Sequence, residues 1–321
     1  QLSAISVTGM GMGRNDFVGD HNDFFGAGYD LGRPDYPAAI YYAQREPGGQ
    51  SITGTVENVH VYLGSGNDFF NVDSTFAGAT TFIHGGAGTD NITVGATETG
   101  LNPNSLRRVD FIAGALHLDG EACTDTIKVD DSGDDNANVG TYTGNRVTGL
   151  DIPSTGSIIF DTADNITIQL GAQADTFYVP TTNANLTTTL KTGGGFDKVY
   201  VGTVPGQEST GSLSNLLGLF KIDGEGPEAN DELFINDQSA TTGRQFRITN
   251  ALDTPVTLED GTPWNHDTTT VSLNGTAIIS YQRMETVALN AGAGADTINL
   301  EKTHREQAVA GKNATFTINA G

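Results

Sequence analysis

The chain has 321 residues, 42 of them glycine, and its 39 acidic side chains against 16 basic ones give a net charge of −23. Nucleic-acid binding requires a basic footprint, so this charge argues against it, and it also disfavours an anionic membrane surface. No apolar run reaches the length of about 18 residues that a membrane-spanning helix needs, so we expect no insertion into a membrane. Abundant Gly, Thr and Asn argue against a mainly helical protein.

A phrase of the form Gly-x-Gly-x-Asp, followed by alternating apolar residues, recurs along the chain from GSGNDFFNV at 64–72 to GAGADTINL at 292–300. The acids that anchor it are Asp68, Asp90, Asp125, Asp175, Asp197, Asp231 and Asp296. The first three are spaced by 22 and 35 residues and the next three by 22 and 34, so each of the first trio has a counterpart about 107 positions later. Such a period is typical of a tandem repeat.

Side-chain periodicity predicts the local structure. Two and four residues after each anchoring Asp the residue is apolar, and the residues between are mostly polar. The pairs are Phe70/Val72, Ile92/Val94, Ile127/Val129, Phe177/Val179, Val199/Val201, Leu233/Ile235 and Ile298/Leu300. A period of two with one apolar face indicates a half-buried strand.

Strand, glycine-rich turn and strand then follow one another at regular intervals, which predicts an all-β fold, a parallel β-solenoid or β-helix with loop excursions. Residues 1–50 would hold the end of a preceding repeat plus an aromatic-rich insertion. Residues 51–157 would form repeat 1, residues 158–278 repeat 2 with an insertion near 251–270, and residues 279–321 the start of repeat 3. We expect one continuous solenoid.

The turn GGAGTDNITV at 85–94 resembles the nonapeptide of RTX proteins, whose parallel β-rolls bind calcium. That resemblance implies calcium, as a cofactor, at the seven anchoring acids named above. Cys123, Gln173 and Ala229 stand where the family has glycine, and the turns lie 22 to 65 residues apart instead of following one another. The alternative is that each Asp closes its own turn by binding nearby backbone N–H groups. The acidic run DDSGDD at 130–135 is predicted to be a solvated loop.

A second resemblance covers nearly all of residues 51–321. The phrases YLGSGNDFFNV, TTFIHGGAGTDNITVG and LDGEACTDTIKVDDSGD follow the order found in large tandem-repeat surface proteins of bacteria, algae and water moulds. The resemblance implies a structural extracellular or cell-surface protein, a rod or filament segment that associates with itself or with neighbouring repeats. The alternative is a calcium-stabilised adhesin or carbohydrate-binding region that takes surface glycans.

A weaker alternative is a polysaccharide-acting β-helix enzyme. The acids of the 130–135 run with Lys128, or the pair Arg244 and Arg247, are the residues that such a site would use. Lys and Arg are too scattered to form a basic cleft, the histidines have no metal-ligand spacing, and carboxylate pairs arise readily among 39 acids. We therefore expect no enzyme.

Two further groups of residues are candidates for modification or contact. The sequons at Asn91, Asn165, Asn185, Asn274 and Asn313 are candidate glycosylation sites. The candidate interface residues, which belong to the aromatic-rich insertion and the 251–270 insertion, are Phe24, Phe25, Tyr36, Tyr41, Tyr42 and Trp264. Cys123, the only cysteine, is predicted to be a small residue packed against the next coil; an intermolecular disulfide is the alternative.

Overall fold

The structure is a computed structural model. It describes residues 6–8, 39–41, 44–45, 52–53, 56–95, 107–184, 186–225, 230–252, 256–257, 263–264, 267–302 and 314–321. These residues form strands and turns without a helix, which confirms the all-β prediction. It follows that no helix in this part of the chain is long and apolar enough to cross a bilayer.

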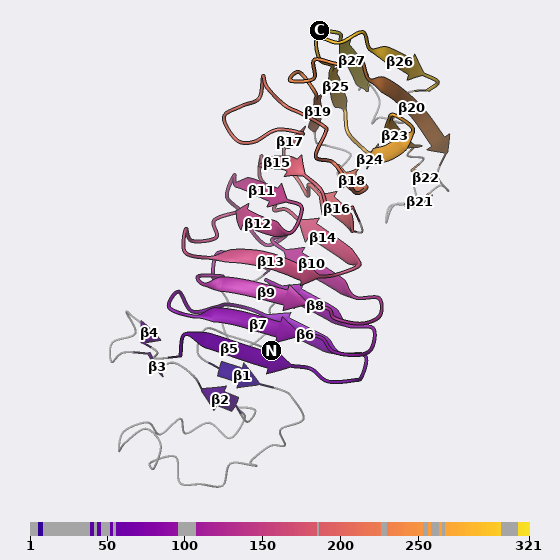
Figure 1. Cartoon of the computed structure of the whole chain (residues 1–321). Coiled ribbons are helices and arrows are strands. Elements are labelled where there is room, and N and C mark those ends of the chain that lie inside the picture. The colour runs from indigo at the N-terminus through magenta and orange to yellow at the C-terminus, as the bar shows by residue number, and fades with distance from the viewer. Residues whose placement is uncertain are drawn as a thin grey trace, which may run out of the picture.

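Two long sheets face each other and make up the body of the protein (Figure 1). Sheet 1 contains, in spatial order, β5 (Asn58–Tyr62), β7 (Thr80–His84), β9 (Ala115–Asp119), β13 (Ser157–Thr162), β12 (Arg146–Gly149), β11 (Val139–Thr143), β15 (Thr176–Thr181), β17 (Lys198–Val201), β19 (Glu232–Asn236), β25 (Thr286–Asn290) and β27 (Thr315–Asn319). Sheet 2 contains β6 (Phe69–Val72), β8 (Asn91–Val94), β10 (Thr126–Asp130), β14 (Asn165–Gln169), β16 (Thr187–Lys191), β18 (Phe220–Asp223), β24 (Thr276–Gln282), β23 (Asp267–Leu273), β20 (Gln245–Leu252) and β26 (Thr297–Leu300).

The remaining strands form small antiparallel pairs outside the two sheets. They are β1 (Ser6–Thr8) with β2 (Ala39–Tyr41), β3 (Gln44–Arg45) with β4 (Ile52–Thr53), and β21 (Val256–Thr257) with β22 (Pro263–Trp264).

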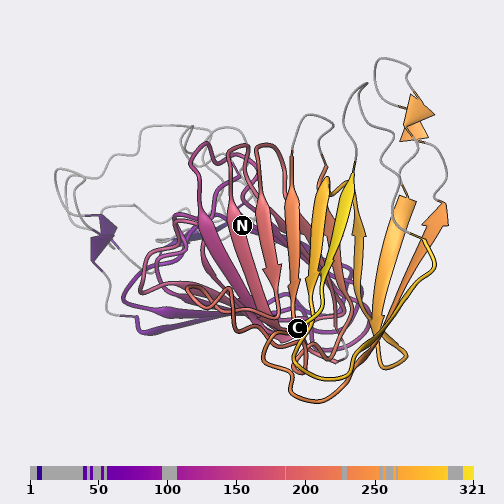
Figure 2. The same ribbon diagram turned by 90° about the horizontal axis from the view of Figure 1, so that it is seen from above.

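The chain winds from a strand of one sheet to a strand of the other, so that each coil lies on the one before it. Neighbouring strands are mostly parallel, and the register places like residues above one another: Ile127 pairs with Ile92 on one side and Ile166 on the other. This is the parallel β-solenoid that the sequence predicts. Viewed down the stack, the strand direction rotates from coil to coil, as the natural twist of β-sheets requires (Figure 2).

The core is a narrow apolar column between the two sheets. Six of the seven predicted apolar pairs are buried in it, from Phe70/Val72 to Leu233/Ile235. The seventh pair lies on β26 at the end of sheet 2, where Leu300 is exposed. Burial of one such side chain contributes roughly 1.5–3 kcal/mol, so a continuous column of them stabilises a chain that is otherwise poor in apolar residues.

Two antiparallel inserts interrupt the parallel stack. In sheet 1 the chain runs from β11 back through β12 to β13, and β13 then pairs in parallel with β9. In sheet 2 it runs from β20 back through β23 to β24, and β24 pairs in parallel with β18. At each insert the chain thus adds three neighbouring strands to one sheet before it crosses to the other sheet, where the next coil adds a single strand.

These inserts occupy equivalent positions in successive copies of the repeat. Counted from β5, the first copy has nine strands, β5–β13, and the second has nine in the two sheets, β14–β20 with β23 and β24. Because nine is odd, corresponding strands fall in opposite sheets: β6 lies in sheet 2, but β15, which begins 107 residues later, lies in sheet 1. Two copies together restore the arrangement, and β25 returns to the sheet of β5.

Glycine is required where the corners of successive coils touch. Gly86 has a φ of 94°, and a Cβ atom there would lie 1.9 Å from the carbonyl oxygen of Gly64 on the preceding coil. Only a residue without a Cβ allows this approach and this backbone conformation together. The glycine-rich composition is therefore partly a consequence of stacking.

Candidate functional site

The anchoring aspartates lie above one another at the corners of the coils and bind the backbone of the neighbouring coil. The N–H of Asp68 donates to Oδ1 of Asp90 at 2.8 Å, and the N–H of Asp90 donates to Oδ1 of Asp125 at 2.8 Å. The N–H of Asp125 then donates to Oδ2 of Asp164 at 2.9 Å. We call these four residues the first Asp column; it follows the corner from sheet 1 to sheet 2.

A second Asp column follows the opposite corner, from sheet 2 to sheet 1. It consists of Asn138, Asp175, Asp197, Asp231 and Glu285, and each backbone N–H donates to the side-chain oxygen of the next member at 2.6–3.0 Å. Asp296 is in neither column: its Oδ1 accepts from the N–H of Arg244, back at the first corner. The seven predicted residues are thus divided among three places, because the copies alternate between the sheets.

A second hydrogen bond in the reverse direction accompanies each carboxylate. The N–H of Asn91 donates to the carbonyl of Asp68 at 2.8 Å, and that of Lys198 donates to the carbonyl of Asp175 at 2.8 Å. Each Asp residue therefore closes a two-way clamp between coils. The alternative prediction, in which each Asp closes its own turn, omits these partners on the neighbouring coil.

Burial makes three of the column carboxylates, those of Asp125, Asp175 and Asp197, hard to ionise. It raises the pKa of Asp197 to about 7 and that of Asp175 to about 6, although both accept backbone hydrogen bonds that act in the opposite direction. Burial also raises the pKa of Asp125, and the adjacent charges of Asp90 and Asp164 raise it further. Asp125, Asp175 and Asp197 thus lie stacked at buried positions, which are unfavourable for a charged carboxylate.

The acidic run at 130–135 is packed into the fold, so the prediction of a solvated loop is wrong. Asp131 and Asp134 are 1% and 2% exposed; Oδ1 of Asp131 accepts the N–H of Val109 at 3.0 Å, and the side chain of Arg108 lies against Asp134. Its Nε donates to the carbonyl of Gly133 at 2.9 Å, and its guanidinium pairs with Asp134 and Asp135. Burial raises the pKa of Asp131 to about 8, so this acid is largely protonated at neutral pH.

Rings line the outer face of sheet 1 and stack on one another from coil to coil. His60 stacks on Phe82 with centroids 4.4 Å apart, and Phe82 stacks on His117 at 4.7 Å. Tyr200 forms a second series, stacking on Tyr178 at 5.1 Å and on Phe234 at 4.7 Å. Neighbouring rings cover each other's faces, so these stacks expose mainly ring edges.

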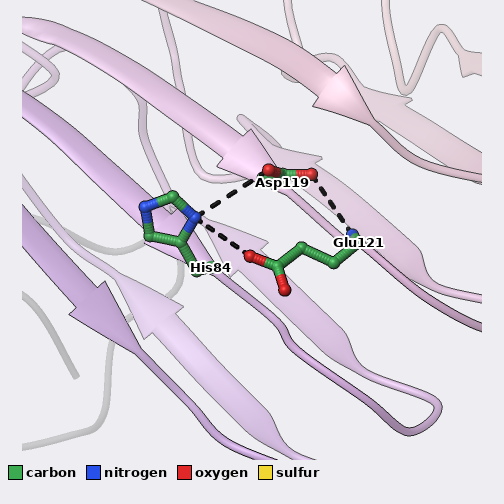
Figure 3. A group of neighbouring side chains, drawn as sticks. All are labelled: His84, Asp119 and Glu121. Atoms are coloured by element: carbon green, nitrogen blue, oxygen red, sulfur yellow. Dashed lines mark hydrogen bonds and ion pairs between the residues drawn. The ribbon is translucent and has the colours of Figure 1, made fainter.

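Figure 3 shows a mixed cluster of His84, Asp119 and Glu121. The ring of His84 is stacked beside that of His60, with centroids 5.5 Å apart. Nδ1 of His84 is 3.2 Å from Oε1 of Glu121 and 3.8 Å from Oδ2 of Asp119. Its other nitrogen, Nε2, is 3.2 Å from Nδ1 of His60. Sequence reasoning misses this cluster because His84 and Asp119 are 35 residues apart, and only the register of β7 with β9 makes them neighbours.

The described part of the chain contains some of the other candidate residues. Asn91 on β8 is half-buried, Asn165 on β14 is exposed, and exposed Asn274 accepts the N–H of Gln245 through Oδ1 at 3.0 Å. Cys123 is exposed, so its predicted packing against the next coil is wrong. The candidates outside the described residues are Asn185, Asn313, Phe24, Phe25, Tyr36 and Tyr42; Tyr41 and Trp264 lie on described strands, without a described side chain.

The fold defines this chain as a parallel β-solenoid with cross-coil carboxylate clamps. Comparison of the chain with known protein families, with characterised proteins and with solved structures found no match.

Proposed function

We propose that this chain is a segment of a structural rod, an extracellular or cell-surface protein that associates through stacked repeats and performs no catalysis. The observation that carries the proposal is that the Asp columns pass from one copy of the repeat to the next. Asp125 in the first copy binds Asp164 at the start of the second, and Asp231 in the second binds Glu285 beyond it. Bonds of this kind favour continued axial stacking.

The alternation of copies supports the same proposal. A copy that adds six strands to one sheet adds three to the other, and the next copy reverses the difference. After two copies both sheets have gained nine strands, so a stack can continue without accumulating a mismatch. At a strand separation of about 4.8 Å, two copies advance the rod by about 43 Å.

The alternative proposal, a calcium-stabilised adhesin or carbohydrate-binding region, has less support in the described residues. Sugars pack on exposed ring faces, whereas Phe82 and Tyr200 have their faces against neighbouring rings.

Electron microscopy of the native particle, labelled with an antibody against residues 107–184, tests the proposal. We expect a thin filament or rod with an axial repeat near 43 Å. Labelled particles that are discrete and without axial periodicity would contradict it.

A further inference from the structure

We propose that His84, Asp119 and Glu121 bind a divalent transition-metal ion on the outer face of sheet 1, with Zn²⁺ as the representative ion. The three side chains each offer one ligand atom, and these atoms lie within 4.8 Å of one another. The separations of 3.2 and 3.8 Å from His84 Nδ1 are close to the ligand–ligand distance of about 3.4 Å in tetrahedral zinc sites. The proposal is independent of the proposed rod function.

The second copy of the repeat provides an internal comparison. The sequence Asp119-Gly120-Glu121 recurs there as Asp223-Gly224-Glu225, and Lys191, 107 residues after His84, pairs with Asp223 in the strand register. Nζ of Lys191 lies 2.6 Å from Oε1 of Glu225. Arg283 adds a second ion pair, with Asp223. In the second copy, therefore, two basic side chains pair with the two carboxylates.

The first copy has the same two carboxylates, but a histidine is their partner instead of a lysine and an arginine. Among the described residues, the ion pairs of Asp119 and Glu121 are both with His84. A neutral imidazole offers one N–H and one lone pair, and it leaves two negative charges uncompensated. A divalent ion bound to Nδ1 and the two carboxylates would supply the two positive charges that Lys191 and Arg283 supply in the second copy.

The surroundings of the cluster orient its ligands. Nε2 of His84 is within hydrogen-bond distance of Nδ1 of His60, so a proton on Nε2 leaves the lone pair of Nδ1 directed at the carboxylates. Asp119 accepts the N–H of Glu121 at 3.2 Å through Oδ1 and also binds the hydroxyl of Thr162, which leaves Oδ2 toward His84. Second-shell partners of this kind fix the tautomer and orientation of metal ligands.

The backbone gives an independent indication that the side chain of Glu121 has a use. Glu121 has a φ of 64°, in the left-handed region that favours glycine. The residues four positions before Asp68, Asp90 and Asp197 are Gly64, Gly86 and Gly193, each with positive φ. Where those turns have glycine, Glu121 retains a side chain that reaches His84, and its counterpart Glu225, with a φ of 49°, reaches Lys191. In both copies the left-handed glutamate thus contacts the side chain on the neighbouring strand, and in the first copy that side chain is an imidazole.

The donor set selects the class of ion. One imidazole nitrogen with two carboxylate oxygens suits zinc, cobalt, manganese or nickel, whereas calcium takes oxygen ligands and more of them. The fourth position in a tetrahedral site would be left for water.

The test is titration of the metal-free full chain with Zn²⁺ by isothermal calorimetry, and with Co²⁺ by visible absorption. Two variants reproduce sister positions: His84→Lys copies Lys191, and Glu121→Gly copies Gly86. We expect the wild type to bind one Zn²⁺ that each variant binds at least 100-fold more weakly, and Co²⁺ to give tetrahedral d–d bands only in the wild type. His117→Gln, which alters the neighbouring imidazole beside Asp161, should retain the site.

Thermal melting separates loss of the ligand from loss of the fold. Zinc should raise the Tm of the wild type and of His117→Gln. It should leave His84→Lys and Glu121→Gly unchanged, and without metal both of these should melt at or above the wild-type temperature. Equal zinc affinity in the wild type and Glu121→Gly would overturn the proposal. So would a wild type that binds zinc at no site, or only at sites that both variants keep.

Discussion

Asp90 accepts, through Oδ1, a 2.8 Å hydrogen bond from the backbone N–H of Asp68, a residue 22 positions earlier and one coil below. The two residues occupy the same position in successive coils, and the bond is repeated along both Asp columns. Its recurrence explains why an acid, rather than any other turn residue, follows the glycines of the motif. The side chain stabilises the contact between coils by accepting a donor that the parallel ladder leaves unpaired.

Replacement of Asp90 tests the clamp. Asp90→Ala leaves the N–H of Asp68 without its acceptor, and we expect it to lower the free energy of unfolding by about 1–3 kcal/mol in urea denaturation. Asp90→Asn retains an oxygen acceptor for the N–H of Asp68 in a side chain of the same shape, so it should keep most of the stability that Asp90→Ala loses. Equal loss in the two variants would mean that the hydrogen bond to the N–H of Asp68 is not what stabilises the contact.

Stability should decrease as the pH rises through the neutral range. Burial raises the pKa of Asp197 to about 7 and that of Asp175 to about 6, whereas both are near 4 in the unfolded chain. Between the unfolded and folded pKa values, the folded chain therefore binds more protons than the unfolded chain. The free energy of unfolding must therefore fall between pH 5 and pH 8. Urea denaturation across this range measures the slope, and Asp197→Asn should reduce it. A rise in stability over the same interval would be incompatible with protonated column acids.

Corner glycines should differ sharply in their tolerance of alanine. Gly86→Ala places a methyl group against the carbonyl of Gly64 in addition to forcing a left-handed backbone, so we expect a loss of about 3 kcal/mol or more. Gly206 has a similar φ of 79°, but a Cβ added there would meet no atom within 4 Å, and Gly206→Ala should cost only about 1 kcal/mol. Similar losses at both sites would show that the coils do not approach as described.

Calcium dependence is the direct test of the RTX resemblance. Buried Asp90, Asp125 and Asp197 use one carboxylate oxygen each for a backbone donor, and calcium takes six to eight oxygen ligands. We expect addition of Ca²⁺ to the metal-free chain to leave its thermal midpoint unchanged. A large calcium-dependent rise would assign the ion to these corners and contradict the clamp as their main role.

The alternation of apolar and polar residues was sufficient to predict the strands and their buried faces. Ile127 and Val129 are read correctly because a period of two is a local property, and it needs only the residues between them. The clamps could not be predicted in the same way, because the partner of each Asp is 22 to 54 residues away and depends on which coil lies next to it.

Burial of the acidic run escaped sequence reasoning for a related reason. Asp131 and Asp134 look solvated in the sequence, but their partners, the N–H of Val109 and the guanidinium of Arg108, belong to a segment that precedes β9. The alternation of copies between the sheets was equally hidden: the strand count becomes odd only through β12 and β23, whose antiparallel pairing no motif marks. The cluster around His84 depends on the same long-range register.

The central claim is that an odd-stranded repeat alternates between two sheets and builds a continuous rod. It is tested most directly by inserting a second copy of residues 58–285 after Glu285, where β25 lies in the sheet of β5. The particle length measured by small-angle X-ray scattering and cryo-electron microscopy should grow by about 43 Å at constant cross-section. A particle that thickens, or two folded bodies joined flexibly, would contradict the account.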